Sequence, residues 1–311
     1  MCAFEKIRAN NALQKRRNEV GMKRKFTILS AILIVALTAC CLFACNDKGD
    51  SPAKVDYQSN NSYFVKTAES ETALTFEPIL DPVYSESGLT YKSVDYRFGV
   101  IFYVGTAIEP KYYEYLGNAL AKQGYLVVMP KVTFNMAYAY YKAQEEAFSA
   151  YPNVKFFVAG HSQGGGFAVR RAFENQDGIK GTILLAPTAS RRPLLDADGN
   201  QMKDENGIDI FVPDTLSETS MPTILINADN DKILLSSEIS AVKDRMPSNY
   251  VDKTIENGCH TGFCEIYETD NLPFKFPNFI ADFNATDLEQ KQSQRTKTVE
   301  YILGFVKDLS K

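Results

Sequence analysis

Five short apolar runs, separated by stretches of helical character, constrain the fold of this 311-residue chain most strongly. Each run is apolar at nearly every position instead of at alternate positions, which is typical of strands buried on both faces of a parallel sheet. The runs lie at residues 99–103, 125–129, 155–159, 182–185 and 223–226. Helices are predicted at residues 111–123, 137–150, 165–174 and 236–245. This alternation predicts an α/β fold, with a mostly parallel central sheet and helices on both faces.

The charge distribution divides the chain into a basic beginning and an acidic body. Residues 1–45 carry eight basic and two acidic side chains, and the remainder carries 26 basic and 36 acidic ones. An acidic body without a basic stripe repels phosphate groups, so we expect no binding of nucleic acid. The chain has only two histidines, so a histidine-based metal site would need carboxylate or thiolate ligands as well. We expect neither a metal nor a cofactor.

The first 45 residues have the layout of a secretory signal. A basic cluster at residues 23–25 precedes about fourteen apolar or small residues and then a small-residue cleavage context. The segment 37–40, Leu-Thr-Ala-Cys, resembles a bacterial lipobox, in which the cysteine, here Cys40, is lipidated and begins the mature chain. A second and poorer candidate ends at Cys45, because the bulky Phe43 stands where a small residue is usual. An uncleaved membrane anchor is the alternative.

Both interpretations of this segment predict an extracytoplasmic protein that is held at the membrane by its N-terminal region. The polar residues 46–61 are expected to form a flexible tether. Residues 62–311 are expected to form a single α/β domain, interrupted by an insertion at about 191–221 that is too long for a simple connection. Within the insertion, residues 198–199 predict the turn of a surface hairpin. Residues 267–285, rich in aromatic side chains, are predicted to form a loop over a pocket.

Two further features concern the end of the body. The segment 288–311 carries a helical stripe of apolar residues and is expected to close one flank of the sheet. Cys259 and Cys264 are the only cysteines of the body, and they bracket His260. An oxidising compartment permits them to form a disulfide, and two free thiols are the alternative.

The chemistry concentrates at residues 160–164, Gly-His-Ser-Gln-Gly, which follow a predicted buried strand and open a predicted helix. This strand–turn–helix context is what a nucleophile elbow requires, with Ser162 as the nucleophile. Side chains at positions 160 and 164 would clash with the neighbouring strand and helix. The helix N-terminus directs the N–H group of Gln163 toward a developing oxyanion. A tightly packed, glycine-rich helix start is the alternative interpretation.

A serine hydroxyl needs a base to take its proton. His161 is adjacent to Ser162 and is expected to point away from the elbow, which leaves His260 as the base. His260 follows a predicted strand at residues 250–256. The base in turn needs a carboxylate that fixes its tautomer, and Asp229 and Asp231, at the end of the strand at 223–226, are the candidates. The chain order serine, aspartate, histidine is that of the α/β hydrolases.

Residues from about 98 to 305 resemble an α/β hydrolase, specifically the bacterial dienelactone-hydrolase-like branch known as α/β-hydrolase family 5. The resemblance rests on residues 99–106, 124–131, 160–164, 228–231 and 257–260. It implies Asp231 as the acid, with Asp229 in reserve, and the backbone N–H of Thr106 as a second oxyanion donor. Dienelactone hydrolases themselves use a cysteine nucleophile, so Ser162 argues against that particular chemistry.

Together these features predict an extracytoplasmic, lipid-anchored serine hydrolase. We expect a carboxylic-ester hydrolase that acts on a small-molecule acyl substrate through an acyl-enzyme. Two alternatives remain open. One is an acyltransferase or amidase that acts on cell-envelope material, because the same three residues serve all of these reactions. The other is a catalytically silent binding lipoprotein on the same fold. The sequence does not indicate an oligomeric state.

Overall fold

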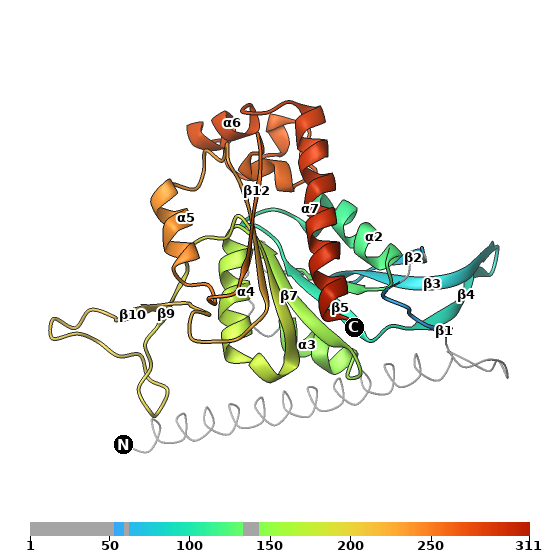
Figure 1. Cartoon of the computed structure of the whole chain (residues 1–311), viewed down its shortest axis with the longest axis horizontal. Helices are drawn as coiled ribbons and strands as arrows, with labels where there is room; N and C mark the ends of the chain where they lie inside the picture. Colours follow the sequence, from blue (N-terminus) through green and yellow to red (C-terminus); the bar gives the residue numbers. More distant parts are fainter. Residues whose placement is uncertain (1–52, 59–61, 133–142) are drawn as a thin grey trace, which may run out of the picture. The chain divides into compact units, whose positions relative to one another are not determined.

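A single large sheet runs through the part of the chain that the computed structural model describes, which is residues 53–58, 62–132 and 143–311 (Figure 1). Its strand order is β1-β4-β3-β6-β5-β7-β8-β11-β12, and β2 pairs with β3 beside this path. The strands are β1 (Ala53–Lys54), β2 (Phe64–Glu69), β3 (Ala73–Ser85), β4 (Gly88–Asp95), β5 (Phe98–Tyr103), β6 (Leu126–Pro130), β7 (Lys155–His161), β8 (Ile179–Leu185), β11 (Thr223–Ala228) and β12 (Val251–Ile255).

From β6 to β12 all neighbouring strands pair in parallel. All five strands predicted from continuous apolar runs are confirmed, and the strand predicted at 250–256 is β12. Every residue of β5, β6 and β11 is buried, because helices cover both faces of this part of the sheet.

The other end of the sheet contains antiparallel strand pairs, which were not predicted. Strand β3 pairs antiparallel with β2, β4 and β6. The first residues of β3 alternate between buried and partly exposed positions, which is the pattern of a strand with one wet face. Its far half and most of β4 are exposed, and the two strands are joined at Gly88, whose φ of 119° lies in the left-handed region that favours glycine.

Helices cover the sheet on two sides (Figure 1). They are α2 (Glu114–Lys122), α3 (Ala143–Ala150), α4 (Gln163–Glu174), α5 (Ser236–Lys243), α6 (Pro277–Phe283) and α7 (Leu288–Leu309), and the 3-10 turn η1 (Pro110–Tyr113) precedes α2. Apolar residues of α2 and α7 belong to one core cluster, and those of α3 and α4 belong to a second, whereas α5 packs Ile239 against the first and contributes Val242 to the second. The predicted helices are confirmed within the described residues, and positions 137–142 of one of them lie outside that part.

The tether prediction is wrong for residues 53–58. Strand β1 pairs in parallel with β4, and the side chains of Val55 and Tyr57 are buried. The Tyr57 hydroxyl accepts hydrogen bonds from the backbone N–H groups of Arg97 (2.9 Å) and Phe98 (3.1 Å). Val55 and Tyr57 therefore hold this mostly polar segment in place. The other residues of the predicted tether that precede position 53, and the whole of 1–45 with Cys40 and Cys45, lie outside the described residues.

The insertion is built from short hairpins. Strands β9 (Arg191–Pro193) and β10 (Phe211–Pro213) pair antiparallel at its base. A bridge between Leu195 and Gln201 closes the predicted hairpin, and Gly199 takes a φ of 83° in its turn. A second hairpin is closed by a bridge between Lys203 and Asp209.

The segment 267–285 differs from the predicted loop. It contains the 3-10 turn η6 (Thr269–Asn271) and the helix α6, so the prediction is wrong for those residues. Pro277 stands in the first turn of α6, where its fixed φ suits a helix start and no backbone N–H is needed. Within the described residues, no helix combines the length and the apolar character that crossing a membrane requires.

Candidate active site

Ser162 occupies the sharp turn between β7 and α4. Its φ of 55° and ψ of −125° are strained for a residue other than glycine. The turn is held by backbone hydrogen bonds, because the Ser162 N–H donates to Leu185 O (2.9 Å) and its carbonyl accepts from the N–H groups of Gly166 (3.1 Å) and Thr188 (3.0 Å).

Glycine stands on both sides of this serine for a steric reason. A Cβ atom at Gly160 would lie 2.3 Å from Gly164 O, and one at Gly164 would lie 2.3 Å from Tyr103 O. Both contacts are with backbone, which cannot give way by rotating a side chain. The predicted glycine requirement is therefore confirmed, and the geometry is that of a nucleophile elbow.

His260 and Asp231 meet beside this turn. His260 opens the 3-10 turn η5 (His260–Phe263), and its Nδ1 lies 2.7 Å from Asp231 Oδ2. Their side chains are 4% and 3% exposed. The other carboxylate oxygen of Asp231 accepts the N–H groups of Ile233 (2.7 Å) and Leu234 (2.9 Å). Asp229, the reserve acid, has an exposed side chain.

Burial raises the pKa of Asp231, but the charge of His260 and the hydrogen bonds from His260, Leu234 and Ile233 lower it by more, so its pKa lies below its ordinary value. The carboxylate is therefore ionised at neutral pH and accepts a hydrogen bond from Nδ1–H of the imidazole. That arrangement leaves Nε2 as the unprotonated nitrogen of a neutral ring, which is what a general base needs.

Four of the residues predicted to form the site line one cavity of about 220 Å³, namely Ser162, His260, Thr106 and Gln163, whereas Asp231 and Asp229 do not line it. The lining also includes Ile108, Thr188, Ile233, Pro273, Phe274 and Phe279. The Thr106 hydroxyl donates to Gln163 Oε1 at 2.8 Å, so the two residues predicted to bind the oxyanion contact each other. Gln163 is the first residue of α4, and its backbone N–H has no acceptor within the helix. Phe274 and Phe279 of the segment 267–285 line this cavity, which agrees with the predicted position of that segment over a pocket.

The prediction that His161 points away from the elbow is wrong. His161 is fully buried, lines the same cavity, and its ring centroid lies 4.7 Å from that of His260. Its Nδ1 shares a hydrogen bond of 2.8 Å with the hydroxyl of Tyr113. Burial, assisted by the charge of His260, holds the pKa of His161 well below its ordinary value. His161 is therefore a neutral, packed neighbour of His260.

Cys259 and Cys264 are both free and buried, so the disulfide prediction is wrong. The two thiols face different parts of the molecule: Cys259 Sγ lies 3.2 Å from Thr286 Oγ1, whereas Cys264 Sγ lies 3.3 Å from the Tyr113 hydroxyl. Burial raises the pKa of Cys264 to about 12, and burial also raises the pKa of Cys259.

Two residues near the site were missed by the sequence analysis. Tyr113 hydrogen-bonds His161 and also accepts the N–H of Gly105 (3.1 Å), on the loop that carries Thr106. Asp282 is a fully buried carboxylate on α6. An aspartate among the apolar residues of that helix is the one sequence signal that could have identified it.

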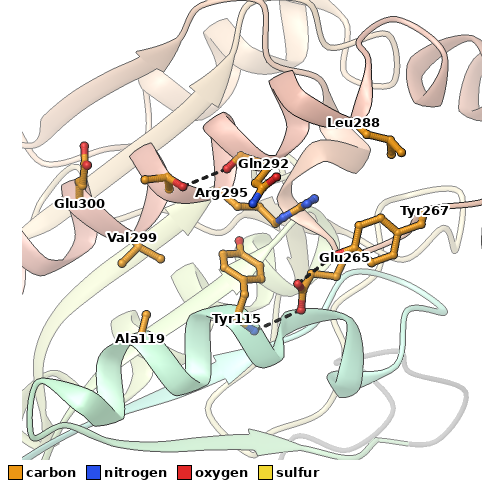
Figure 2. A pocket seen from close by; sticks show the side chains of 10 residues that line it. Tyr115, Ala119, Glu265, Tyr267, Leu288, Gln292, Arg295, Val299 and Glu300 are labelled. Atoms are coloured by element: carbon orange, nitrogen blue, oxygen red, sulfur yellow. Dashed lines mark hydrogen bonds between the residues drawn. The ribbon is translucent and has the colours of Figure 1, made fainter. Parts of the chain in front are cut away.

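A larger cavity of about 570 Å³ lies elsewhere, between α2 and α7. Figure 2 shows Tyr115 of α2 facing Arg295 of α7, with Glu265 and Tyr267 beside them. His161, His260, Cys259 and Cys264 do not line this cavity, so the chemistry described above is not located there. The described residues contain no cluster of three or more side chains that could hold a metal ion.

Comparison with known proteins agrees with the fold. Residues 99–201 match the family described as the alpha/beta hydrolase family. No curated protein matches the chain. The match covers one part of the chain and agrees with the α/β-hydrolase fold of the mostly parallel sheet.

Solved structures that resemble the chain do so only distantly. One belongs to the metagenome-derived lipolytic enzymes LipS and LipT (17% identity, 60% of this chain and 91% of that chain, TM-score 0.40). Another is Est1E from Butyrivibrio proteoclasticus (13% identity, 78% and 98%, TM-score 0.43). A third is the esterase domain of a Rhodothermus marinus protein (14% identity, 76% and 98%, TM-score 0.42). Likeness of this degree says nothing about the activity of this chain.

Proposed function

We propose that this protein is a serine hydrolase that cleaves carboxylic esters through an acyl-enzyme, as in the dienelactone-hydrolase-like branch but with serine as the nucleophile. The observation that carries the proposal is the 2.7 Å contact between Asp231 and His260, which lines the same cavity as a serine on a nucleophile elbow. A binding protein on this fold would not need a strained serine beside a histidine whose tautomer is fixed by a buried carboxylate.

The reaction proceeds in two halves. Nε2 of His260 takes the proton of Ser162 while Oγ attacks the ester carbonyl. The N–H groups of Gln163 and Thr106 donate hydrogen bonds to the carbonyl oxygen as it becomes negatively charged. The imidazolium, stabilised by Asp231, then gives its proton to the departing alkoxide. Water, activated by the same histidine, attacks the acyl-enzyme and releases the acid.

The cavity favours a small, neutral acyl group. Its volume of about 220 Å³ lies below the range of roughly 300–1,000 Å³ that is usual for drug-sized ligands. Ile108, Ile233, Phe274 and Phe279 supply apolar walls, and the rings of Phe274 and Phe279 pack edge to face with centroids 5.2 Å apart. Among the described residues that line the cavity, His161 and His260 are the only titratable ones. We therefore expect short, uncharged acyl esters as substrates.

A fluorophosphonate probe tests this function directly, because it labels only an activated serine. We expect stoichiometric labelling of the wild-type protein and none of Ser162→Ala. A panel of nitrophenyl esters then tests the acyl preference, and we expect acetyl and butyryl esters to be cleaved much faster than lauroyl esters. Failure of the folded wild-type protein to react with the probe would exclude a serine hydrolase, and faster cleavage of matched amides would identify an amidase instead.

We further propose that Cys40 carries a lipid and that the mature protein is held on the outer side of the membrane. The support is the lipobox-like segment 37–40 behind the basic and apolar residues of the leader. Mass spectrometry of the protein recovered from the membrane fraction should show an N-terminal lipidated Cys40. A mature protein that begins elsewhere with an unmodified residue would contradict this, and a lipid on Cys45 would move the assignment to the second candidate.

A further inference from the structure

A second buried carboxylate connects the two loops that carry Asp231 and His260. The Asp282 side chain, on α6, has no exposed surface. Its Oδ1 accepts the backbone N–H of His260 itself (3.0 Å) and that of Lys232, the residue that follows Asp231 (2.9 Å). Its Oδ2 accepts both the N–H (2.8 Å) and the hydroxyl (2.8 Å) of Thr261.

We propose that Asp282 is a positioning residue for the reaction, and this role rests on the proposed function. One rigid carboxylate that accepts four hydrogen bonds from two loops fixes their distance, and this distance determines how the imidazole meets the carboxylate of Asp231. A displacement of about 1 Å in such a site lowers turnover by roughly 100-fold.

The ring and the backbone of His260 are thus held by two different carboxylates. Asp231, on the loop after β11, lies 2.7 Å from Nδ1 of the ring, whereas Asp282 accepts the backbone N–H of the same residue at 3.0 Å.

Positive charge near this group comes from α7. Lys291 is 2% exposed, donates to the Phe283 carbonyl, and interacts electrostatically with Asp282. Arg295 donates to the Cys264 carbonyl at 3.1 Å, and its guanidinium lies over the rings of Tyr115 and Tyr267. Both side chains thus hold backbone next to Asp282 and next to η5.

An uncharged clamp on the same loop provides a matched control. Gln294 of α7 is fully buried, accepts the Cys259 N–H at 3.0 Å and donates to the Cys259 carbonyl at 2.9 Å. It holds the residue before His260 much as Asp282 holds His260 and the residue after it. Gln294→Met removes two hydrogen bonds from this loop at nearly constant volume and changes no charge.

The test compares Asp282→Asn and Gln294→Met with the wild type, after circular dichroism has shown that each variant is folded. Asp282→Asn keeps one acceptor oxygen but replaces the other by an amide donor, so part of the link between the two loops is lost. Gln294→Met removes only the hydrogen bonds to Cys259 and leaves that link in place.

Turnover of a short ester is the readout. In Asp282→Asn we expect kcat to fall by roughly 10- to 100-fold with little change in KM, and in Gln294→Met we expect a smaller fall. A kcat in folded Asp282→Asn that equals the wild-type value, or that falls no more than in Gln294→Met, would overturn the positioning role. If Asp282→Asn does not fold, Thr261→Val removes one of the four hydrogen bonds, and an unchanged kcat in that variant would overturn the role. A wild-type protein that hydrolyses no ester and does not react with the fluorophosphonate probe would instead refute the proposed function.

Discussion

The Nδ1 atom of His260 lies 2.7 Å from Oδ2 of Asp231, and the opposite oxygen of that carboxylate is occupied by two backbone N–H groups from the residues that follow. The carboxylate therefore cannot rotate without losing two hydrogen bonds, and it presents one oxygen to the imidazole. Asp229 stands two residues earlier on the same loop with an exposed side chain.

This contrast predicts how two similar substitutions will differ. Asp231→Asn should lower kcat by about 10⁴-fold, because the amide favours the wrong tautomer of the imidazole. Asp229→Asn removes an exposed carboxylate of the same loop and should change kcat by less than about 10-fold. Steady-state hydrolysis of a short ester measures both. The reverse ranking would assign the acid to Asp229.

The elbow glycines allow a steric prediction. In Gly160→Ala the new methyl group meets the backbone of Gly164 and Gly165 at 2.3–2.7 Å, so the turn that carries Ser162 must move. We expect a loss of about 1–3 kcal/mol in the free energy of unfolding and a fall in kcat of roughly 100-fold. Gly304→Ala is the matched control, because a Cβ atom there meets nothing within 4 Å and the residue lies inside α7.

Denaturant unfolding and ester hydrolysis give the two values. The control should be as stable as the wild type or more stable by up to about 1 kcal/mol, since alanine favours a helix over glycine. Equal stability and equal kcat of Gly160→Ala and the wild type would show that the turn has room that the structure does not allow.

The buried His161 makes stability depend on pH. Its pKa in the folded protein is well below its ordinary value, whereas the unfolded chain binds a proton near pH 6.5. The unfolded state therefore holds more protons as the pH falls below about 6.5, and the free energy of unfolding decreases by about 1.4 kcal/mol per pH unit. This loss continues until the pH reaches the folded-state pKa.

Unfolding in denaturant at about pH 7.5, 6.5 and 5.5 measures this dependence. His161→Gln keeps a polar partner for Tyr113 but cannot titrate, so its stability should fall less steeply over the same range. The low pKa of Asp231 affects stability in a different pH range. The ionised carboxylate stabilises the folded protein above about pH 3.9, and this stabilisation is lost only as the pH falls further. Parallel curves for the wild type and His161→Gln would mean that His161 does not cause the loss.

The parts of the fold that are fixed by local sequence were predictable. A continuous apolar run identifies a strand with two covered faces, and the run at 155–159 followed by Gly-His-Ser-Gln-Gly identifies the elbow, because strand, turn and helix are adjacent in the chain. Strand β3 was missed because its burial alternates and its second half is exposed. The packing of residues 53–58 depends on only Val55 and Tyr57 within a polar segment.

The parts of the site that depend on distant contacts were not predictable. The direction of His161 is set by Tyr113, which lies 48 residues away in the chain. Asp282 contacts His260 and Lys232, which are 22 and 50 residues away. The spacing of Cys259 and Cys264 suggested a bridge, but the 3-10 turn η5 between them directs the two thiols to different neighbours.

The free thiols give the last prediction. Because the pKa of Cys264 is raised to about 12, only about one molecule in ten thousand carries the thiolate at pH 8, and the side chain is fully buried as well. Cys259 is equally buried and its pKa is also raised. We expect neither thiol to react with a thiol reagent in the native protein, and both to react after denaturation without a reductant.

A reductant should therefore change neither turnover nor the melting temperature. Cys264→Ala tests the same prediction by substitution. It removes the contact with Tyr113 and should lower the free energy of unfolding by about 1–2 kcal/mol, whether or not reductant is present. The measurement is a thiol count on protein recovered from an oxidising compartment and denatured without reduction. If Cys259 and Cys264 do not react in this count, and turnover falls on reduction, then the two residues form a disulfide. That result would contradict the separation of the two thiols.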